Sequence, residues 1–98
     1  MIAYTPRASR HVDDLIQHYK DRLRPEAIAA LLTAMDEAES KIARNPASGL
    51  KAPRPYPELR RTGRAWVQAG RYWFAYSTTK PPVIVGVYYD TANIPGRA

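Results

Sequence analysis

The stretch from Ala65 to Asp90 constrains the fold more than any other part of this chain. Most of its residues outside two short breaks are β-branched or aromatic, and it holds both tryptophans, the single phenylalanine and four of the seven tyrosines. Such residues suit a pleated, half-buried surface. Gly70 and the segment 77–82, which contains two prolines, divide the stretch into three runs. Short connections favour neighbouring antiparallel strands, so these runs predict a β-meander.

A sheet this apolar needs a cover on one face, and the first half of the chain has the pattern of two helices. Thr5 followed by Pro6 is typical of a helix start, because the hydroxyl can cap and proline suits the first turn. Arg24 followed by Pro25 breaks that helix, since the residue before proline leaves the helical region. Apolar residues recur at steps of three and four on both sides of the break. The pattern predicts helices over residues 6–23 and 25–45, paired as an antiparallel hairpin.

The order of these patterns predicts a single α+β domain over residues 1–98. A short strand over residues 2–5 comes first, and the helical hairpin follows over about residues 6–45. A proline-rich loop over residues 46–57 leads to the meander over about residues 59–90, and residues 91–98 form a short tail. The predicted architecture is therefore an antiparallel helical hairpin packed on a twisted antiparallel β-sheet. Alternation within the sheet places Tyr72, Phe74 and Tyr76 on one face and Arg71, Trp73 and Ala75 on the other, so that one of the two sets is core.

The net positive charge lies in the second half of the chain. Residues 1–50 hold seven Lys/Arg and seven Asp/Glu, whereas residues 51–98 hold eight and two, so the net charge of +6 belongs to the sheet half. Four arginines form the strongest cluster in the sequence: Arg60, Arg61, Arg64 and Arg71. Guanidinium groups bind phosphates and carboxylates in bidentate fashion. The cluster indicates an anionic partner, either nucleic acid or an acidic protein segment, with a merely solvated basic surface as the alternative.

Other kinds of chemistry find little support in the sequence. The chain has no cysteine, and its two histidines, His11 and His18, are about 10 Å apart on one helix with no third ligand evident, so we expect surface histidines and no metal site. No nucleophile-and-base pair or phosphate-binding glycine loop is evident, so neither catalytic residues nor cofactors are predicted. Asp90 is expected to be a turn residue or a salt-bridge partner. No apolar run could span a bilayer and the N-terminus lacks a secretion signal, so we expect a cytoplasmic protein without membrane contact.

Five segments in this order resemble the RelE/ParE toxin superfamily of bacterial type II toxin–antitoxin systems, and together they cover nearly the whole chain. They are Tyr4-Thr5-Pro6-Arg7-Ala8, Asn45-Pro46-Ala47-Ser48-Gly49, Pro57-Glu58-Leu59-Arg60, Gly70-Arg71-Tyr72 with Tyr76, and the last strand from Val83 to Tyr89. RelE-like members of this superfamily cut messenger RNA on the ribosome, commonly with a late tyrosine. ParE-like members share the fold and poison DNA gyrase.

The lead-in Pro57-Glu58-Leu59-Arg60 and the start Gly70-Arg71-Tyr72 look more like ParE, and Trp73 stands where RelE members carry an arginine. The resemblance therefore implies a toxin that inhibits DNA gyrase by binding rather than by catalysis. The alternative is a RelE-like, ribosome-dependent endoribonuclease, in which Arg60, Arg61 and Arg71 hold phosphates and Tyr88 or Tyr89 assists proton transfer.

A cognate antitoxin is implied in either case, as an acidic chain that is partly disordered alone and folds on the toxin. The candidate contacts with the target are Arg60, Arg61, Arg64, Arg71, Tyr88 and Tyr89, together with the tail. The candidate contacts with the antitoxin are Tyr19, Leu23, Leu31 and Met35. These four lie on the helical hairpin. They line a groove for an antitoxin helix only if they are not internal, and we expect most of them to lie in the core.

Overall fold

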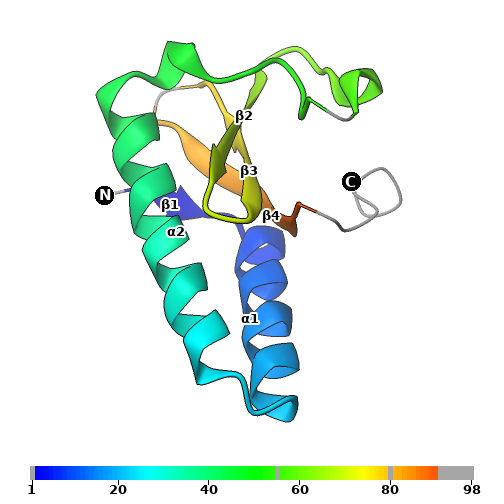
Figure 1. Ribbon diagram of the computed structural model, residues 1–98. Coiled ribbons are helices and arrows are strands. Elements are labelled where there is room, and N and C mark those ends of the chain that lie inside the picture. Colours follow the sequence, from blue (N-terminus) through cyan, green and yellow to red (C-terminus); the bar gives the residue numbers. More distant parts are fainter. Residues whose placement is uncertain (1, 55, 80, 91–98) are drawn as a thin grey trace.

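The computed structural model describes residues 2–54, 56–79 and 81–90, so the tail over residues 91–98 lies outside the described residues. The elements in chain order are β1 (Ala3–Tyr4), α1 (Pro6–Asp21), α2 (Pro25–Arg44), β2 (Arg64–Ala69), β3 (Tyr72–Ser77) and β4 (Val83–Tyr89). Short 3-10 turns, η1 (Pro46–Ser48) and η2 (Pro57–Leu59), interrupt the proline-rich segment between α2 and β2. The two helices lie antiparallel and pack against one four-stranded sheet, which confirms the predicted α+β architecture (Figure 1).

The sheet has the strand order β1-β4-β3-β2, and its last three strands form the predicted antiparallel meander. β1 differs, because it runs parallel to β4 with Ala3 opposite Val83 and Tyr4 opposite Ile84. The sheet is therefore mixed rather than wholly antiparallel. A parallel pair needs a long crossover connection, and here the whole helical hairpin and two strands lie between the partners. β1 ends after two residues because Pro6 begins the helix.

α1 begins as predicted and ends two residues before the predicted end. The Thr5 hydroxyl accepts a hydrogen bond from the Ala8 N–H at 3.1 Å, which caps the helix at its N-terminus. At the other end the Leu23 N–H donates to the Lys20 carbonyl at 3.1 Å, and the Arg24 N–H donates to the Tyr19 carbonyl at 2.8 Å. This pair of bonds is a Schellman motif, which requires a left-handed residue just past the helix, and Leu23 takes that conformation with φ of 55°.

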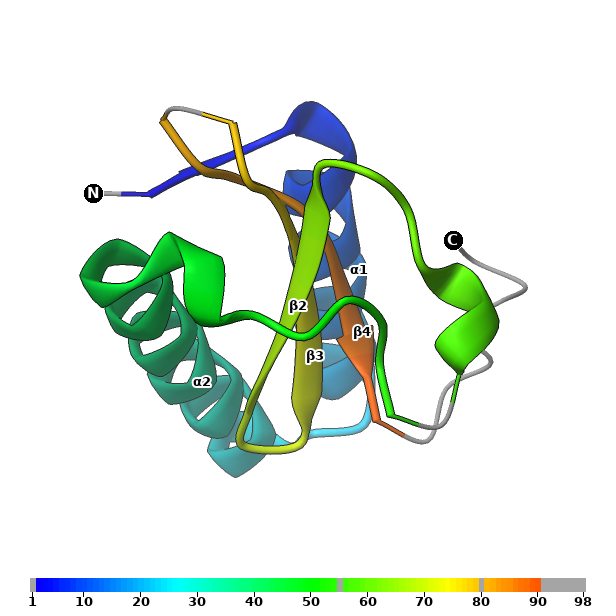
Figure 2. The ribbon, with the colours of Figure 1, turned by 90° about the horizontal axis from the view of Figure 1, so that it is seen from above.

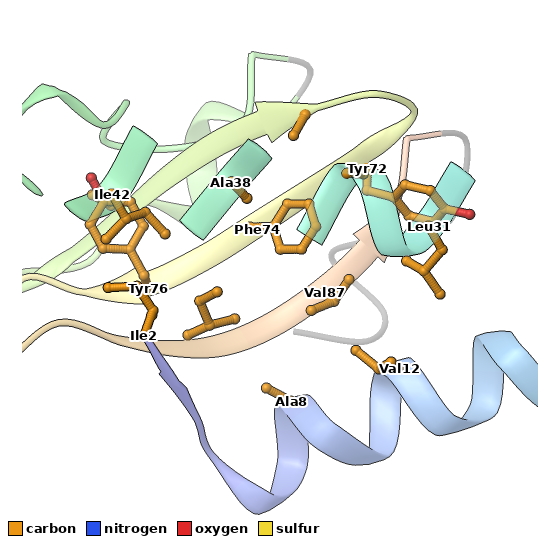
Figure 3. Packing of buried hydrophobic residues seen from close by; sticks show 14 residues of the cluster. Ile2, Ala8, Val12, Leu31, Ala38, Ile42, Tyr72, Phe74, Tyr76 and Val87 are labelled. Carbon is orange, nitrogen blue, oxygen red and sulfur yellow. The ribbon is translucent and has the colours of Figure 1, made fainter. Parts of the chain in front are cut away.

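The main core lies between the helical hairpin and the sheet (Figure 3). Tyr72, Phe74 and Tyr76 of β3 share one face, as predicted. That face is turned toward the helices, and the three side chains pack in one cluster with Leu31 and Ile42 of α2. The tyrosine hydroxyls are hydrogen-bonded. The Tyr76 hydroxyl donates to the Pro46 carbonyl at 2.6 Å, and the Tyr72 hydroxyl is bonded to the Tyr19 hydroxyl. The helix-facing set of the meander is thus core, as its alternation predicts.

The second face of the sheet is also buried, so the expectation that one set of alternating residues is core was incomplete. Trp66, Trp73, Ala75 and Tyr88 form a second cluster, with Tyr56 and Leu59 of the proline-rich segment packed against it. Figure 2 shows this segment, coloured green, passing across the strands on its way to β2. Leu50 joins the edge of β2 by two hydrogen bonds with the backbone of Trp66, at 2.8 and 2.7 Å. The predicted loop is therefore a cover for the second face.

Among the residues that the structure describes, neither helix combines the length and the apolar character that crossing a membrane requires.

Candidate functional site

Four basic side chains gather near the start of β2, which follows the segment over residues 45–63 that we call the covering segment. Lys51, Arg60, Arg61 and Arg64 line an open hollow of about 640 Å³, which we call the basic hollow. The rest of its wall consists of small or neutral residues: Pro46, Ala47, Gly49, Thr62, Gly63, Ala65 and Thr78. No carboxylate or imidazole is among the described residues that line it. The hollow therefore concentrates cationic groups beside hydroxyls and backbone, which suits an anionic ligand.

The local fold fixes the place of these arginines. Leu59 ends η2 with its side chain against the second core cluster, so Arg60 and Arg61 follow directly at the margin of that cluster. A tight turn comes next, in which the Arg64 N–H donates to the Arg61 carbonyl at 3.3 Å. Gly63 makes this turn possible with φ of 74°, a backbone conformation that side chains disfavour. Arg61 and Arg64 are thus the two ends of one short turn at the start of β2, and Arg60 adjoins it.

The cations of the basic hollow are open to solvent. Arg60, Arg61 and Lys51 are exposed, and Arg64 is half-buried. The ion pairs within residues 2–54, 56–79 and 81–90 join Arg24 to Glu26, Lys41 to Glu37 and Arg71 to Asp90, and none of them includes a cation of the hollow. The positive charge of the hollow is consequently available to a ligand rather than neutralised by the protein itself.

Arg71 does not belong to this cluster, although the sequence places it there. Arg64 is paired with Ser77 at one end of the β2–β3 ladder, and Arg71 lies in the turn at the other end. The Arg71 guanidinium lies 3.2 Å from the Asp90 carboxylate and 5.4 Å from the centre of the Tyr89 ring. The predicted role of Asp90 as a salt-bridge partner is confirmed, and the predicted cluster of four arginines is reduced to three.

Tyr88 and Tyr89 point to opposite faces of the sheet and form no joint site. Tyr88 is buried in the second core cluster, where its ring centre lies 5.0 Å from that of His11 and 5.7 Å from that of Trp66. Burial raises the pKa of the Tyr88 phenol, although Arg7, Arg64 and Arg61 act in the opposite direction. Tyr89 is half-buried on the helix side, with its ring edge-on to Tyr72 at 5.5 Å.

The expectation that both histidines lie on the surface was wrong for His11. The Val87 N–H donates to His11 Nδ1 at 3.2 Å. β1 pairs only with the beginning of β4. No other strand within residues 2–54, 56–79 and 81–90 pairs with that edge, and α1 packs against β4 instead. His11 thereby satisfies a backbone donor on the edge of β4. His18 is exposed, and no group of metal-binding residues occurs in the described part of the chain.

The four residues predicted to contact an antitoxin lie in different environments. Leu31 is fully buried, as the preference for the core expected. Tyr19 and Met35 are half-buried against the same core, and the Tyr19 hydroxyl is hydrogen-bonded to the Tyr72 hydroxyl. Leu23 is 86% exposed at the tip of the helical hairpin. Only Leu23 among these four presents most of its side chain to solvent.

Reasoning from the sequence missed Lys51, which the structure brings into the basic hollow, and a second basic region beside it. This second hollow, of about 660 Å³, lies between the end of α2 and the edge of β2, and Lys41, Arg44 and Arg54 are among its lining residues. Lys41 also donates to the Gln68 carbonyl on that edge at 3.1 Å. The excess of Lys and Arg after residue 50 was the signal for Lys51 and Arg54, but it gives the amount of charge and not its location. It gave no signal for Lys41 and Arg44, which lie in the half of the chain whose charges balance.

Comparison of the sequence with models of known protein families and with curated proteins finds no match.

Proposed function

We propose that this chain is the toxin of a type II toxin–antitoxin module and that it inhibits DNA gyrase by docking, as its resemblance to ParE implies. The observation that carries the proposal is the basic hollow, in which Lys51, Arg60, Arg61 and Arg64 surround an open space of about 640 Å³. Exposed guanidinium groups in a confined space bind anionic surfaces and raise the rate of association with them. Arg71 lies at the other end of the sheet and is not part of this contact.

The surroundings of the hollow favour docking over catalysis. General acid–base catalysis needs a titratable group within hydrogen-bond reach of the reacting atoms. The described lining of the basic hollow offers only Lys and Arg as titratable groups. Tyr88, one of the two tyrosines suggested for proton transfer, is buried beside His11 and Trp66. Tyr89, the other, is half-buried against the core on the helix side of the sheet. The ribonuclease alternative therefore has the phosphate-binding part of a site but lacks a presented acid or base.

An acidic antitoxin fits the same surface. A segment rich in carboxylates, disordered alone, would neutralise the hollow when it folds against the toxin. Leu23 is the candidate apolar anchor for such a partner on the helical hairpin, because its side chain is 86% exposed. Its left-handed backbone conformation lowers the stability of the free protein. Leu31 contributes only by supporting the hairpin from inside.

The test is a supercoiling assay with purified gyrase and relaxed plasmid, read on a gel. Two variants, each lacking three positive charges, make the comparison. The hollow variant carries Arg60→Ala, Arg61→Ala and Arg64→Ala. The helix variant carries Arg10→Ala, Lys20→Ala and Arg22→Ala on the exposed surface of α1 and its end.

Inhibition with trapped cleaved DNA, retained by the helix variant and lost by the hollow variant, is the expected result. No effect of the native protein in excess would contradict the proposal for the gyrase tested. Cleavage of ribosome-bound messenger RNA would then establish the alternative, with Tyr88→Phe and Tyr89→Phe as the variants to compare.

A further inference from the structure

We infer that the basic hollow binds the sugar–phosphate backbone of duplex DNA, so that the toxin contacts DNA held by gyrase rather than gyrase alone. This inference rests on the proposed function and specifies the partner of the same site. Its basis is the composition of the hollow, which offers four cationic side chains, two threonine hydroxyls and glycine backbone without an acidic residue in its described lining. Arg, Lys, Thr and backbone N–H groups are the donors that proteins direct at phosphate oxygens.

The density of charge favours a nucleic acid over an acidic protein. Duplex DNA carries one negative charge per ~1.7 Å of helix axis, which no ordinary protein surface approaches. Arg61 and Arg64 are the two ends of one hydrogen-bonded turn, and Arg60 adjoins it. Three guanidinium groups this close repel one another, and a run of closely spaced phosphates offsets that repulsion better than scattered carboxylates do. An antitoxin can meet the same charge, but it does so with a flexible chain that folds on binding.

The absence of an aromatic platform favours a duplex over a single strand. Proteins that bind single-stranded nucleic acid stack its bases on exposed aromatic rings. No aromatic residue is among the described residues that line the basic hollow. Trp66, Trp73 and Tyr88, on the second face of the sheet, are buried. The hollow therefore meets phosphates only, and such contacts position a protein on DNA without reading its sequence.

The number of cations sets the expected dependence on salt. For four phosphate contacts, the slope of log K against log salt concentration is about −3.6, because each contact with duplex DNA contributes about −0.9. Affinity then falls roughly 150-fold between about 50 and about 200 mM salt. The hollow variant keeps only Lys51, so its slope approaches about −0.9. The helix variant loses the same net charge and keeps the slope of the native protein.

The experiment measures fluorescence anisotropy of the full chain with a labelled duplex of about 20 base pairs and arbitrary sequence, and with single-stranded RNA of the same length. Circular dichroism verifies that both variants are folded. We expect the native protein and the helix variant to bind duplex with the steep salt slope, and the hollow variant to bind at least about 10-fold more weakly with a shallow slope. RNA is expected to bind more weakly than duplex.

Two results would overturn the inference. One is a hollow variant that binds duplex with the affinity and salt slope of the native protein, and the other is RNA binding that exceeds duplex binding. The supercoiling assay separates this failure from that of the proposed function. Gyrase inhibition by a protein that does not bind DNA removes the inference and leaves the toxin proposal intact. DNA binding through the hollow without any effect on gyrase removes the gyrase proposal and leaves the DNA contact.

Discussion

Replacing Gly49 by alanine tests how the covering segment is held against the sheet. Gly49 follows η1 and lines the basic hollow. A methyl group there would overlap the Tyr76 hydroxyl and would lie 2.8 Å from the Ala65 side chain. The backbone at Gly49 has φ of −65° and ψ of 155°, which any residue adopts, so overlap rather than backbone strain is the effect of the change.

Burial and a hydrogen bond both hold Tyr76 in place. Its side chain is fully buried, and its hydroxyl donates to the Pro46 carbonyl at 2.6 Å. Overpacking of this kind costs about 1–3 kcal/mol, and the displaced hydrogen bond adds about 1 kcal/mol. We therefore expect Gly49→Ala to lower the free energy of unfolding by about 2–4 kcal/mol. In a domain of this size each kcal/mol lowers Tm by about 4–8 °C, so the transition should fall by at least about 8 °C.

Urea and thermal unfolding followed by circular dichroism give these quantities. Gly63→Ala is the matched control, because an added methyl there meets nothing within 4 Å and costs only about 1 kcal/mol for its positive φ. The double variant Gly49→Ala with Tyr76→Phe is the sharper test, since removing the hydroxyl removes the nearest atom. We expect the double variant to be at least about 1 kcal/mol more stable than additivity predicts. Strict additivity, or a loss no larger than that of Gly63→Ala, would refute the steric reasoning.

Three further predictions concern stability. Burial raises the pKa of Tyr4 and Tyr72 above 10.0, so the unfolded chain loses these protons at lower pH than the folded protein does. The free energy of unfolding should therefore fall as pH rises past about 10, by up to about 1.4 kcal/mol per pH unit for each tyrosine. Tyr72→Phe should make this fall shallower in urea titrations, and an unchanged dependence on pH would contradict the prediction. Leu23→Gly should raise the free energy of unfolding by about 1 kcal/mol, because glycine suits the left-handed position and the lost side chain is exposed. His11→Phe should cost about 1–3 kcal/mol by leaving the Val87 N–H without its acceptor, measured by the same unfolding and by faster amide exchange at that residue.

Local signals in the sequence account for the predicted elements that the structure confirms. Thr5 and Pro6 fix the start of α1 because capping and the fixed φ of proline depend on neighbouring residues alone. Alternation fixes the faces of Tyr72 and Trp73 because successive side chains of a strand point to opposite sides. Neither signal requires knowledge of what lies across the core. The class of fold, the hairpin and the meander were therefore within reach of pattern alone.

The misplaced features all depend on pairings between distant parts of the chain. Arg64 and Arg71 are close in sequence, but a strand advances about 3.3 Å per residue, so β2 carries them to opposite ends of the sheet. His11 reads as a surface residue on its own helix and becomes an acceptor only because β1 leaves part of the β4 edge without a strand. Lys51 reaches the basic hollow only through the path of the covering segment. No local pattern encodes such placements.

The second core cluster determines where the positive charge lies. Leu59 and Tyr56 have apolar surface that is buried only against Trp66 and its neighbours, and that burial stabilises the path of the covering segment. Arg60 and Arg61 follow Leu59 without an intervening residue, so they must emerge at the margin of the cluster, beside the turn that begins β2. The hollow is thus a consequence of covering the second face of the sheet. The path of the backbone there depends on apolar contacts that carry no charge, whereas the side chains of Arg60 and Arg61 are exposed to solvent.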